Sequence, residues 1–166
     1  SKTGVAYLTG LSFSAGDAVA VVVAKDPGSG GIWLKKSDET TTVRSVVLTS
    51  ADILISNPAN VDCAIHVFLN LTAAEAADIT VISAGYGGLA STLTAYKITG
   101  LATSAALDKT ASATGSTTAP SSGQTPTLTQ ADELLIGGIG TEGPDGDAPG
   151  TWDAGANQAT DNGQRL

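Results

Sequence analysis

The run Ala18–Ala24 (AVAVVVA) constrains the fold more than any other part of the chain. Its valines are β-branched and favour extended backbone, and its lack of polar residues predicts a strand that is buried on both faces or central in a sheet. Turn-forming residues bound the run, with Gly16-Asp17 before it and Asp26-Pro27-Gly28 after it. A short buried strand needs other strands beside it, so the sequence predicts a sheet protein.

Further short strand patterns follow one another along the chain, separated by Gly, Pro, Asn and Asp. They are Val5–Leu8, Ile32–Lys35, Val43–Leu48, Asp52–Ile55, Cys63–Asn70, Ile79–Ile82, Thr92–Thr99 and Glu133–Ile139. The sequence Thr72-Ala-Ala-Glu75 matches a capping box and predicts one helical turn over Ala73–Ala77. The pattern predicts an all-β fold, an antiparallel β-sandwich of jelly-roll-like type.

The chain of 166 residues fits one domain, which we expect to span residues 1–140. The Ser/Thr-rich tract Asp108–Gln130 is predicted to be a long crossover that leads to Glu133–Ile139. Residues 141–166 have no strand or helix periodicity, and their large apolar residues are Trp152 and Leu166. Such a segment is either a loop whose returning strand lies beyond this sequence or an extended arm. We favour an arm that becomes ordered against a neighbouring subunit.

Charge and hydropathy exclude two kinds of partner. The formal net charge of -8 argues against nucleic acid, which requires clustered cations. The longest apolar run, Ala18–Ala24, is far shorter than the roughly 20 residues of a membrane span, so we expect no membrane insertion. The start Ser1-Lys2-Thr3-Gly4 lacks a signal-peptide pattern. Charged residues make up 14% of the chain, against about 25% in average domains, which suits a surface that faces other subunits or the outside world.

The sequence predicts no cofactor site. Residues Gly138–Gly143 (GIGTEG) match the G-x-G-x-x-G motif of dinucleotide-binding proteins. That site requires a helix directly after the motif, whereas Pro144-Asp145-Gly146 breaks a helix and adds negative charge where phosphates would bind. We therefore interpret the match as chance.

The densest acidic group follows the same motif and consists of Glu142, Asp145, Asp147 and Asp153. Asp145, Asp147 and Asp153 are candidate Ca²⁺ ligands, because Ca²⁺ favours flexible loops that offer several carboxylates. The twelve-residue calcium-loop pattern is not present. A solvated turn without metal is the preferred interpretation.

His66 and Cys63 are the single histidine and the single cysteine. By strand alternation His66 shares a face with Ala64 and Phe68, and no G-x-S-x-G turn accompanies it, so we expect a partly buried or interface histidine. Cys63 falls on the opposite face with Ile65, where we expect a small core residue without a disulfide partner. The chain is therefore predicted not to be an enzyme.

Trp33, Trp152 and Leu166 are the predicted interface residues. Either tryptophan can stack on a sugar ring or act as an anchor buried in a neighbouring subunit, and we prefer the anchor. The sequon Asn70-Leu71-Thr72 is a possible glycan acceptor.

Three motifs carry a resemblance to known proteins: Leu93–Gly100 (LTAYKITG), Leu107–Gly115 (LDKTASATG) and Ala131–Gly137 (ADELLIG). Together they resemble a loose group of jelly-roll-like or lectin-like β-sandwich proteins of phage virions and bacterial surfaces. The resemblance runs from about Ala18 to Gly143. Members of the group continue with further strands after an element like Gly163-Gln164-Arg165. The motifs contain nothing catalytic, and the resemblance implies a virion or an extracellular surface as the location.

These observations lead to two expected functions. The first is a non-enzymatic structural protein of a virion, as a capsid decoration or tail component, or of a surface assembly. It would act through contacts with copies of itself or with a major capsid, tail or surface protein. The alternative is a carbohydrate-binding module or adhesin, with a glycan as its partner.

Overall fold

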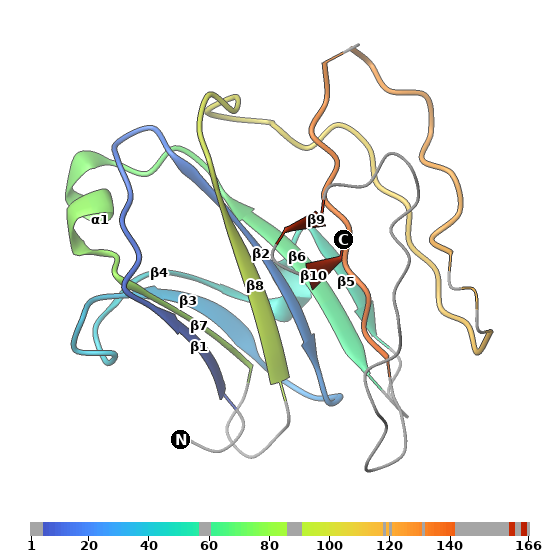
Figure 1. Cartoon of the computed structure of the whole chain (residues 1–166), viewed down its shortest axis with the longest axis horizontal. Coiled ribbons are helices and arrows are strands. Elements are labelled where there is room, and N and C mark those ends of the chain that lie inside the picture. The colour runs from blue at the N-terminus through green and yellow to red at the C-terminus, as the bar shows by residue number, and fades with distance from the viewer. Residues whose placement is uncertain are drawn as a thin grey trace.

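The computed structural model describes residues 5–56, 61–85, 91–117, 119, 121–130 and 132–141, and the backbone of residues 160–161 and 164–165. Strands dominate this part of the chain (Figure 1). The first eight are β1 (Val5–Thr9), β2 (Ala18–Lys25), β3 (Gly31–Lys35), β4 (Thr42–Val47), β5 (Ile53–Ser56), β6 (Asp62–Phe68), β7 (Val81–Gly85) and β8 (Ser91–Ile98). The short strands β9 (Thr160–Asp161) and β10 (Gln164–Arg165) pair with each other.

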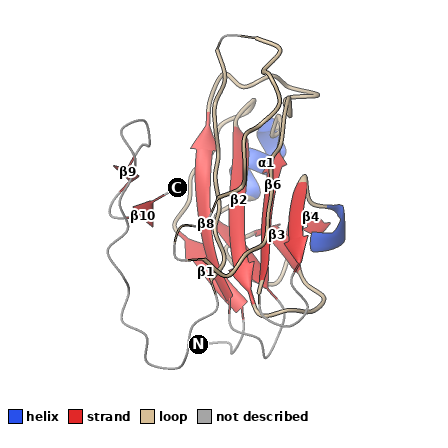
Figure 2. Ribbon diagram, turned by 90° about the vertical axis from the view of Figure 1, so that its right-hand side faces the viewer, coloured by secondary structure: helices blue, strands red, loops and turns tan. Residues whose placement is uncertain are grey.

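The eight longer strands form two antiparallel sheets, and in Figure 2 strands β8, β2 and β6 of one sheet lie in front of β1 and β3 of the other. One sheet has the order β1-β7-β3-β4 and the other has the order β5-β6-β2-β8. The connections β3–β4 and β5–β6 stay within one sheet, whereas the other connections between consecutive strands from β1 to β8 pass from one sheet to the other. This arrangement confirms the predicted all-β fold with antiparallel sheets, and two such sheets are compatible with a β-sandwich. The jelly-roll subtype stays a prediction.

One hydrophobic cluster joins the two sheets. It contains Val19, Val21 and Val23 of β2 together with residues from β3, β6 and β7 such as Ile32, Phe68 and Ile82. Burying one Val, Ile, Leu or Phe side chain contributes about 1.5–3 kcal/mol to stability. The alternate residues of β2 therefore supply the centre of the core that holds the sheets together.

The predicted central position of Ala18–Ala24 in a sheet is confirmed, and all of its residues except Val22 and Ala24 are buried. Strand β2 lies between β6 and β8 in its sheet, and its odd-numbered valines enter the core. Ala18 and Ala20, whose side chains point to the outer face, are also buried, at 2% and 0% exposure. The outer face of this sheet is therefore covered in the folded chain.

The predicted helical turn is present as α1 (Ala73–Asp78). The Glu75 amide donates to Thr72 Oγ1 over 3.2 Å and the Thr72 amide donates to Glu75 Oε2 over 2.8 Å, which completes the capping box. Ile79 caps the end of the helix, so the strand predicted at Ile79–Ile82 begins two residues later, at Val81. A short 3₁₀ helix, η1 (Leu48–Ser50), connects β4 and β5.

The strand predicted at Glu133–Ile139 is wrong, because residues 132–141 form neither strand nor helix. Gly138 lies against outward-pointing side chains of two different strands, Val22 of β2 and Ile65 of β6. The segment thus runs over the face of a sheet. Its backbone cannot form strand hydrogen bonds there, because the strands of the sheet already pair with one another. Its apolar residues Leu134-Leu135-Ile136 are consecutive, and the glycines that follow favour close packing over strand pairing.

The predicted arm, residues 141–166, lies outside the described residues apart from Thr141 and the backbone of β9 and β10. In the part of the chain that the structure describes, none of the helices has the length and apolar character needed to cross a membrane.

Candidate interaction surfaces

Residues 132–141, here called the cover segment, lie on the outer face of the sheet β5-β6-β2-β8. A Cβ atom on Gly138 would lie 2.6 Å from Val22 Cγ1 and 3.4 Å from Cys63 Sγ. A Cβ atom on Gly140 would lie 3.0 Å from Val61 Cγ2. At Gly138 a side chain would force neighbouring atoms to shift, and at Gly140 it would make a tight contact, so glycine suits this close approach. Two glycines of the G-x-G-x-x-G match therefore serve packing.

Cys63 and Ile65 lie beneath the cover segment, each 8% exposed. Cys63 is buried as predicted, but it lies between the sheet and the cover segment and not between the two sheets. The cause is strand alternation: Ala64 and Phe68 of β6 enter the central cluster, so Cys63 points the other way. Burial raises the pKa of the Cys63 thiol, which keeps it protonated and unreactive at neutral pH.

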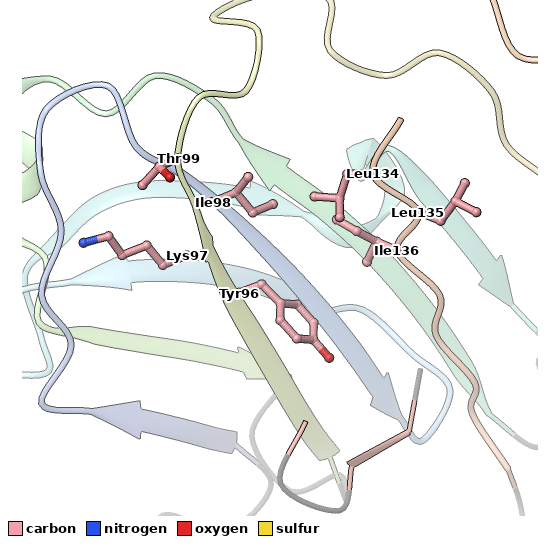
Figure 3. Close-up of a pocket in the computed structure, with 7 residues that line it drawn as sticks. All are labelled: Tyr96, Lys97, Ile98, Thr99, Leu134, Leu135 and Ile136. Atoms are coloured by element: carbon pink, nitrogen blue, oxygen red, sulfur yellow. The ribbon is translucent and has the colours of Figure 1, made fainter. Parts of the chain in front are cut away.

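The cover segment presents large apolar side chains to solvent. Leu134 is 56% exposed and Leu135 is 68% exposed. Between the cover segment and the end of β8 lies a hollow of about 300 Å³, lined by Tyr96, Lys97, Ile98, Thr99, Leu134, Leu135 and Ile136. Figure 3 shows Leu134 on the side of the segment that faces Ile98, and Leu135 on the opposite side. Exposed large apolar residues gathered around a hollow are typical of an interaction surface.

The Ser/Thr-rich tract is closed at its base by one carboxylate. Asp108 accepts hydrogen bonds from the Thr129 amide at 2.8 Å and from Thr129 Oγ1 at 2.6 Å, across 21 residues of chain. The Lys109 ammonium, 2.7 Å from Asp108 Oδ1, and the Thr129 donors hold the pKa of Asp108 well below its usual range. The tract therefore leaves and returns to one place as a largely exposed loop (Figure 1), and we call this contact the Asp108–Thr129 clasp.

Trp33 lies on the outer face of the other sheet, in a cross-strand row. Tyr7 of β1 and Trp33 of β3 both pair with Ser83 of β7, and Ser45 of β4 pairs with Trp33 on its other side. A Cβ atom on Gly31 would lie 2.9 Å from Trp33 Cζ2, so the indole lies over this glycine. Trp33 and Tyr7 are half-buried within the chain.

A cation lies beside both aromatic rings of this row. Lys35 Nζ is 5.8 Å from the ring centroid of Trp33 and 6.0 Å from that of Tyr7, within the range of cation–π attraction. The same ammonium donates to the Glu39 carbonyl over 3.0 Å, which fixes its position. We call Tyr7, Trp33 and Lys35 the aromatic platform.

His66 lies at the edge of the core, where its side chain is 18% exposed. Its Nδ1 is 3.1 Å from Asp52 Oδ2, but the contact is not aligned as a hydrogen bond, and Nδ1 has no hydrogen-bond partner among the described residues. The same carboxylate oxygen accepts from the Val67 amide over 2.7 Å. Burial lowers the pKa of His66, against the opposing effect of Asp52. The predicted partial burial is confirmed.

Lys25 and Asp62 form an ion pair that the sequence did not reveal. Lys25 Nζ lies 3.1 Å from Asp62 Oδ2 and also donates to the carbonyls of Asp26 and Gly28 over 2.6 and 2.8 Å. Asp62 Oδ1 accepts from Ser56 Oγ over 2.6 Å. The two side chains are 0% and 6% exposed, so the ion pair is structural and inaccessible to a ligand. Lys25 pairs with Asp62 in the register of β2 and β6, and register is not readable from either segment alone.

Several predicted site residues lie outside the described residues. They are the interface residues Trp152 and Leu166 and the acidic residues Glu142, Asp145, Asp147 and Asp153. Within the described ranges, no three or more His, Cys, Asp or Glu side chains come together in a group that would hold a metal ion. The calcium alternative therefore stays untested at its own residues.

Comparison of the chain with models of protein families, with curated proteins and with solved structures gave no match.

Proposed function

We propose that the chain is a non-enzymatic structural protein that acts through subunit contacts in a virion, as capsid decoration or tail component, or in a surface assembly. The observation that carries the proposal is the cover segment, with Leu134 and Leu135 exposed beside a hollow of about 300 Å³. Contiguous exposed apolar side chains around such a hollow favour a protein partner. The partner is a copy of this chain or a major capsid, tail or surface protein.

A contact of this size needs further anchors. Burying Leu134 and Leu135 contributes about 1.5–3 kcal/mol each, whereas association itself costs at least about 4 kcal/mol. A stable interface therefore requires more apolar area than the cover segment alone presents. The C-terminal residues 141–166, with Trp152 as the anchor, are the proposed source of the remainder.

The extended arm and the jelly-roll-like subtype are part of this proposal. Ordering an arm costs about 1–2 kcal/mol per residue in backbone entropy, and burying Trp152 recovers only a few kcal/mol. Addition of the arm to a sheet edge of a partner would supply backbone hydrogen bonds for the rest. Strand β4 is suited to accept it, because it ends its sheet and Val47 is 60% exposed there.

The test is the mass of the native particle, measured by native mass spectrometry and light scattering. The full chain is expected to form a regular assembly far heavier than the 16.4 kDa of one copy. Deletion of residues 141–166 is expected to abolish assembly and to leave a folded domain, because the core cluster of the described part of the chain precedes the deletion.

A surface variant distinguishes the contribution of the cover segment to assembly from that of the arm. Leu134→Ser with Leu135→Ser is expected to weaken assembly, whereas Leu107→Ser, which changes a residue of similar exposure (54%), should leave it unchanged. A full chain that stays monomeric, or a deletion variant that assembles like the full chain, would overturn the assembly proposal.

A carbohydrate-binding module or adhesin is the second candidate function. It is favoured by one observation, the half-buried Trp33 that lies over Gly31 on an outer sheet face. An aromatic ring presented in this way offers a stacking surface within a single chain.

A further inference from the structure

We propose that the aromatic platform of Tyr7, Trp33 and Lys35 binds a saccharide, with a pyranose ring stacked on the exposed part of the Trp33 indole. The inference rests on the second candidate function and names its site and ligand class. It does not depend on the assembly proposal, because the platform and the cover segment lie on the outer faces of different sheets.

The orientation of the indole follows from two glycines. Gly31 of β3 pairs with Gly85 of β7, so two neighbouring positions of the sheet face carry no side chain. Trp33, two residues further along β3, lays its ring over Gly31. Glycines on a sheet face permit close approach of another group, and here that group is the indole itself. The indole is thereby packed on the sheet and stays partly exposed, with Lys35 Nζ over the ring at 5.8 Å from its centroid, so a stacked pyranose would take the exposed part of the ring beside the ammonium.

Polar groups surround the ring. Lys35 Nζ, 5.8 Å from the Trp33 centroid, has three N–H donors, of which one is directed to the Glu39 carbonyl. The Ser45 side chain, next to Trp33 in the row, is exposed. A ligand stacked on the indole would therefore meet an ammonium on one side and a hydroxyl on the other.

A second observation concerns Ser83, which lies between Tyr7 and Trp33 in the row. Its Oγ atom is fully buried and has no hydrogen-bond partner among the described residues. Buried hydroxyls are nearly always paired, so an unpaired one calls for an explanation such as a missing water or ligand. Because Ser83 is 0% exposed, a water enclosed beneath the Tyr7 and Trp33 rings would be its partner, and the direct ligand contacts are left to Trp33, Lys35 and Ser45.

The combination selects a saccharide among possible ligands. A pyranose has an apolar C–H face that suits the negative face of an indole, and hydroxyls around its rim that suit Lys35 and Ser45. The interface of a second copy would bury apolar area, whereas this row alternates aromatic rings with serines. The net charge of -8 disfavours a nucleic acid on the same ring.

Binding is tested on the full chain with an array of pyranose oligosaccharides and by sedimentation with insoluble cellulose and chitin. Retention on at least one of these probes is expected. Trp33→Ala should weaken that retention by about tenfold or more, and Trp33→Tyr should restore part of it because a planar ring returns. In a Trp152→Phe background, Trp33 is the only tryptophan, so the bound oligosaccharide should change its fluorescence directly.

The matched control is Leu107→Ala, which removes an exposed apolar side chain outside both the platform and the cover segment and should retain the saccharide as the unaltered chain does. Thermal melting and circular dichroism establish that each variant is folded. No retention on any probe, or equal retention by Trp33→Ala, overturns the proposal. A change of particle mass in Trp33→Ala without any saccharide binding also overturns it and makes this face an interface between copies. Loss of assembly in the leucine variants leaves it untouched.

Discussion

At the scale of single residues, the titration of His66 is set by burial and by two charged neighbours. Burial lowers its pKa most and the Arg44 charge lowers it further, whereas the carboxylate of Asp52, 3.1 Å away, raises it; the net effect is a lowered pKa. Because the folded-state pKa lies below the ordinary 6.5, the unfolded chain binds this proton more readily. Stability is therefore unaffected by His66 above pH 6.5 and decreases as the pH falls from 6.5 through the folded-state pKa.

The single histidine makes this testable without assignment ambiguity. In proton NMR the imidazole resonance should titrate with a midpoint below 6.5, and His66→Gln should remove the corresponding slope from the stability–pH curve. A midpoint above 6.5 would mean that Asp52 outweighs burial and Arg44 together and that the sign of the effect is the reverse.

The buried ion pair of Lys25 and Asp62 gives a second residue-scale prediction. Lys25→Met should lower the free energy of unfolding by about 3–5 kcal/mol, because it leaves the Asp62 carboxylate buried without its cation. The double variant Lys25→Met with Asp62→Leu should recover much of that loss, since neither charge remains. Chemical denaturation measures both.

The exposed pair of Lys36 and Asp78 is the control for this comparison. Its side chains are 42% and 44% exposed, so Lys36→Met should change stability by less than about 1 kcal/mol. Equal losses for Lys25→Met and Lys36→Met would contradict the structural role of the buried pair.

At the scale of elements, the cover segment stays on the sheet because its glycines allow a close approach to the side chains beneath. A methyl group on Gly138 would meet Val22 Cγ1 at 2.6 Å, so Gly138→Ala should lift the segment and cost about 1–3 kcal/mol. Cys63 lies beneath and reports the change: its reaction with a thiol reagent should accelerate about tenfold, as the exposed state becomes more populated.

Two further variants serve as controls for the expected reactivity of Cys63. Gly115→Ala adds a methyl group where nothing lies within 4 Å and should leave Cys63 unreactive. Val22→Ala combined with Gly138→Ala removes the clashing methyl groups and should slow the reaction again. Unchanged thiol reactivity in Gly138→Ala would show that the segment is not the barrier over Cys63.

Sequence reasoning located the strands well because each pattern is local. The valine run of β2 and the alternation in β6 depend on side-chain types within a few residues, and both are confirmed. The prediction failed at Glu133–Ile139. A run of apolar residues indicates that a segment tends to be buried, but it does not indicate that the segment forms hydrogen bonds with a neighbouring strand. Whether such a segment joins a sheet edge or lies on a sheet face depends on distant strands.

At the scale of the whole molecule, the fold class was predictable and the surfaces were not. Short strands with turn signals predict two antiparallel sheets, as observed. Trp33 was singled out from the sequence, but its partners Tyr7 and Ser83 come from β1 and β7, far away in the chain. No local pattern connects these residues. The roles of Trp152 and Leu166 stay predictions.

Because the Asp108–Thr129 clasp closes the loop, the length of that loop has little effect on the free energy of folding. Both ends are fixed by the same carboxylate, so residues added between them change only the entropy of closing a longer loop. That entropy grows with the logarithm of loop length, and doubling the loop costs only about 0.6 kcal/mol. The same scaffold can therefore carry tracts of very different length and sequence at this site, which makes it a natural place for display of foreign peptides and for rapid divergence.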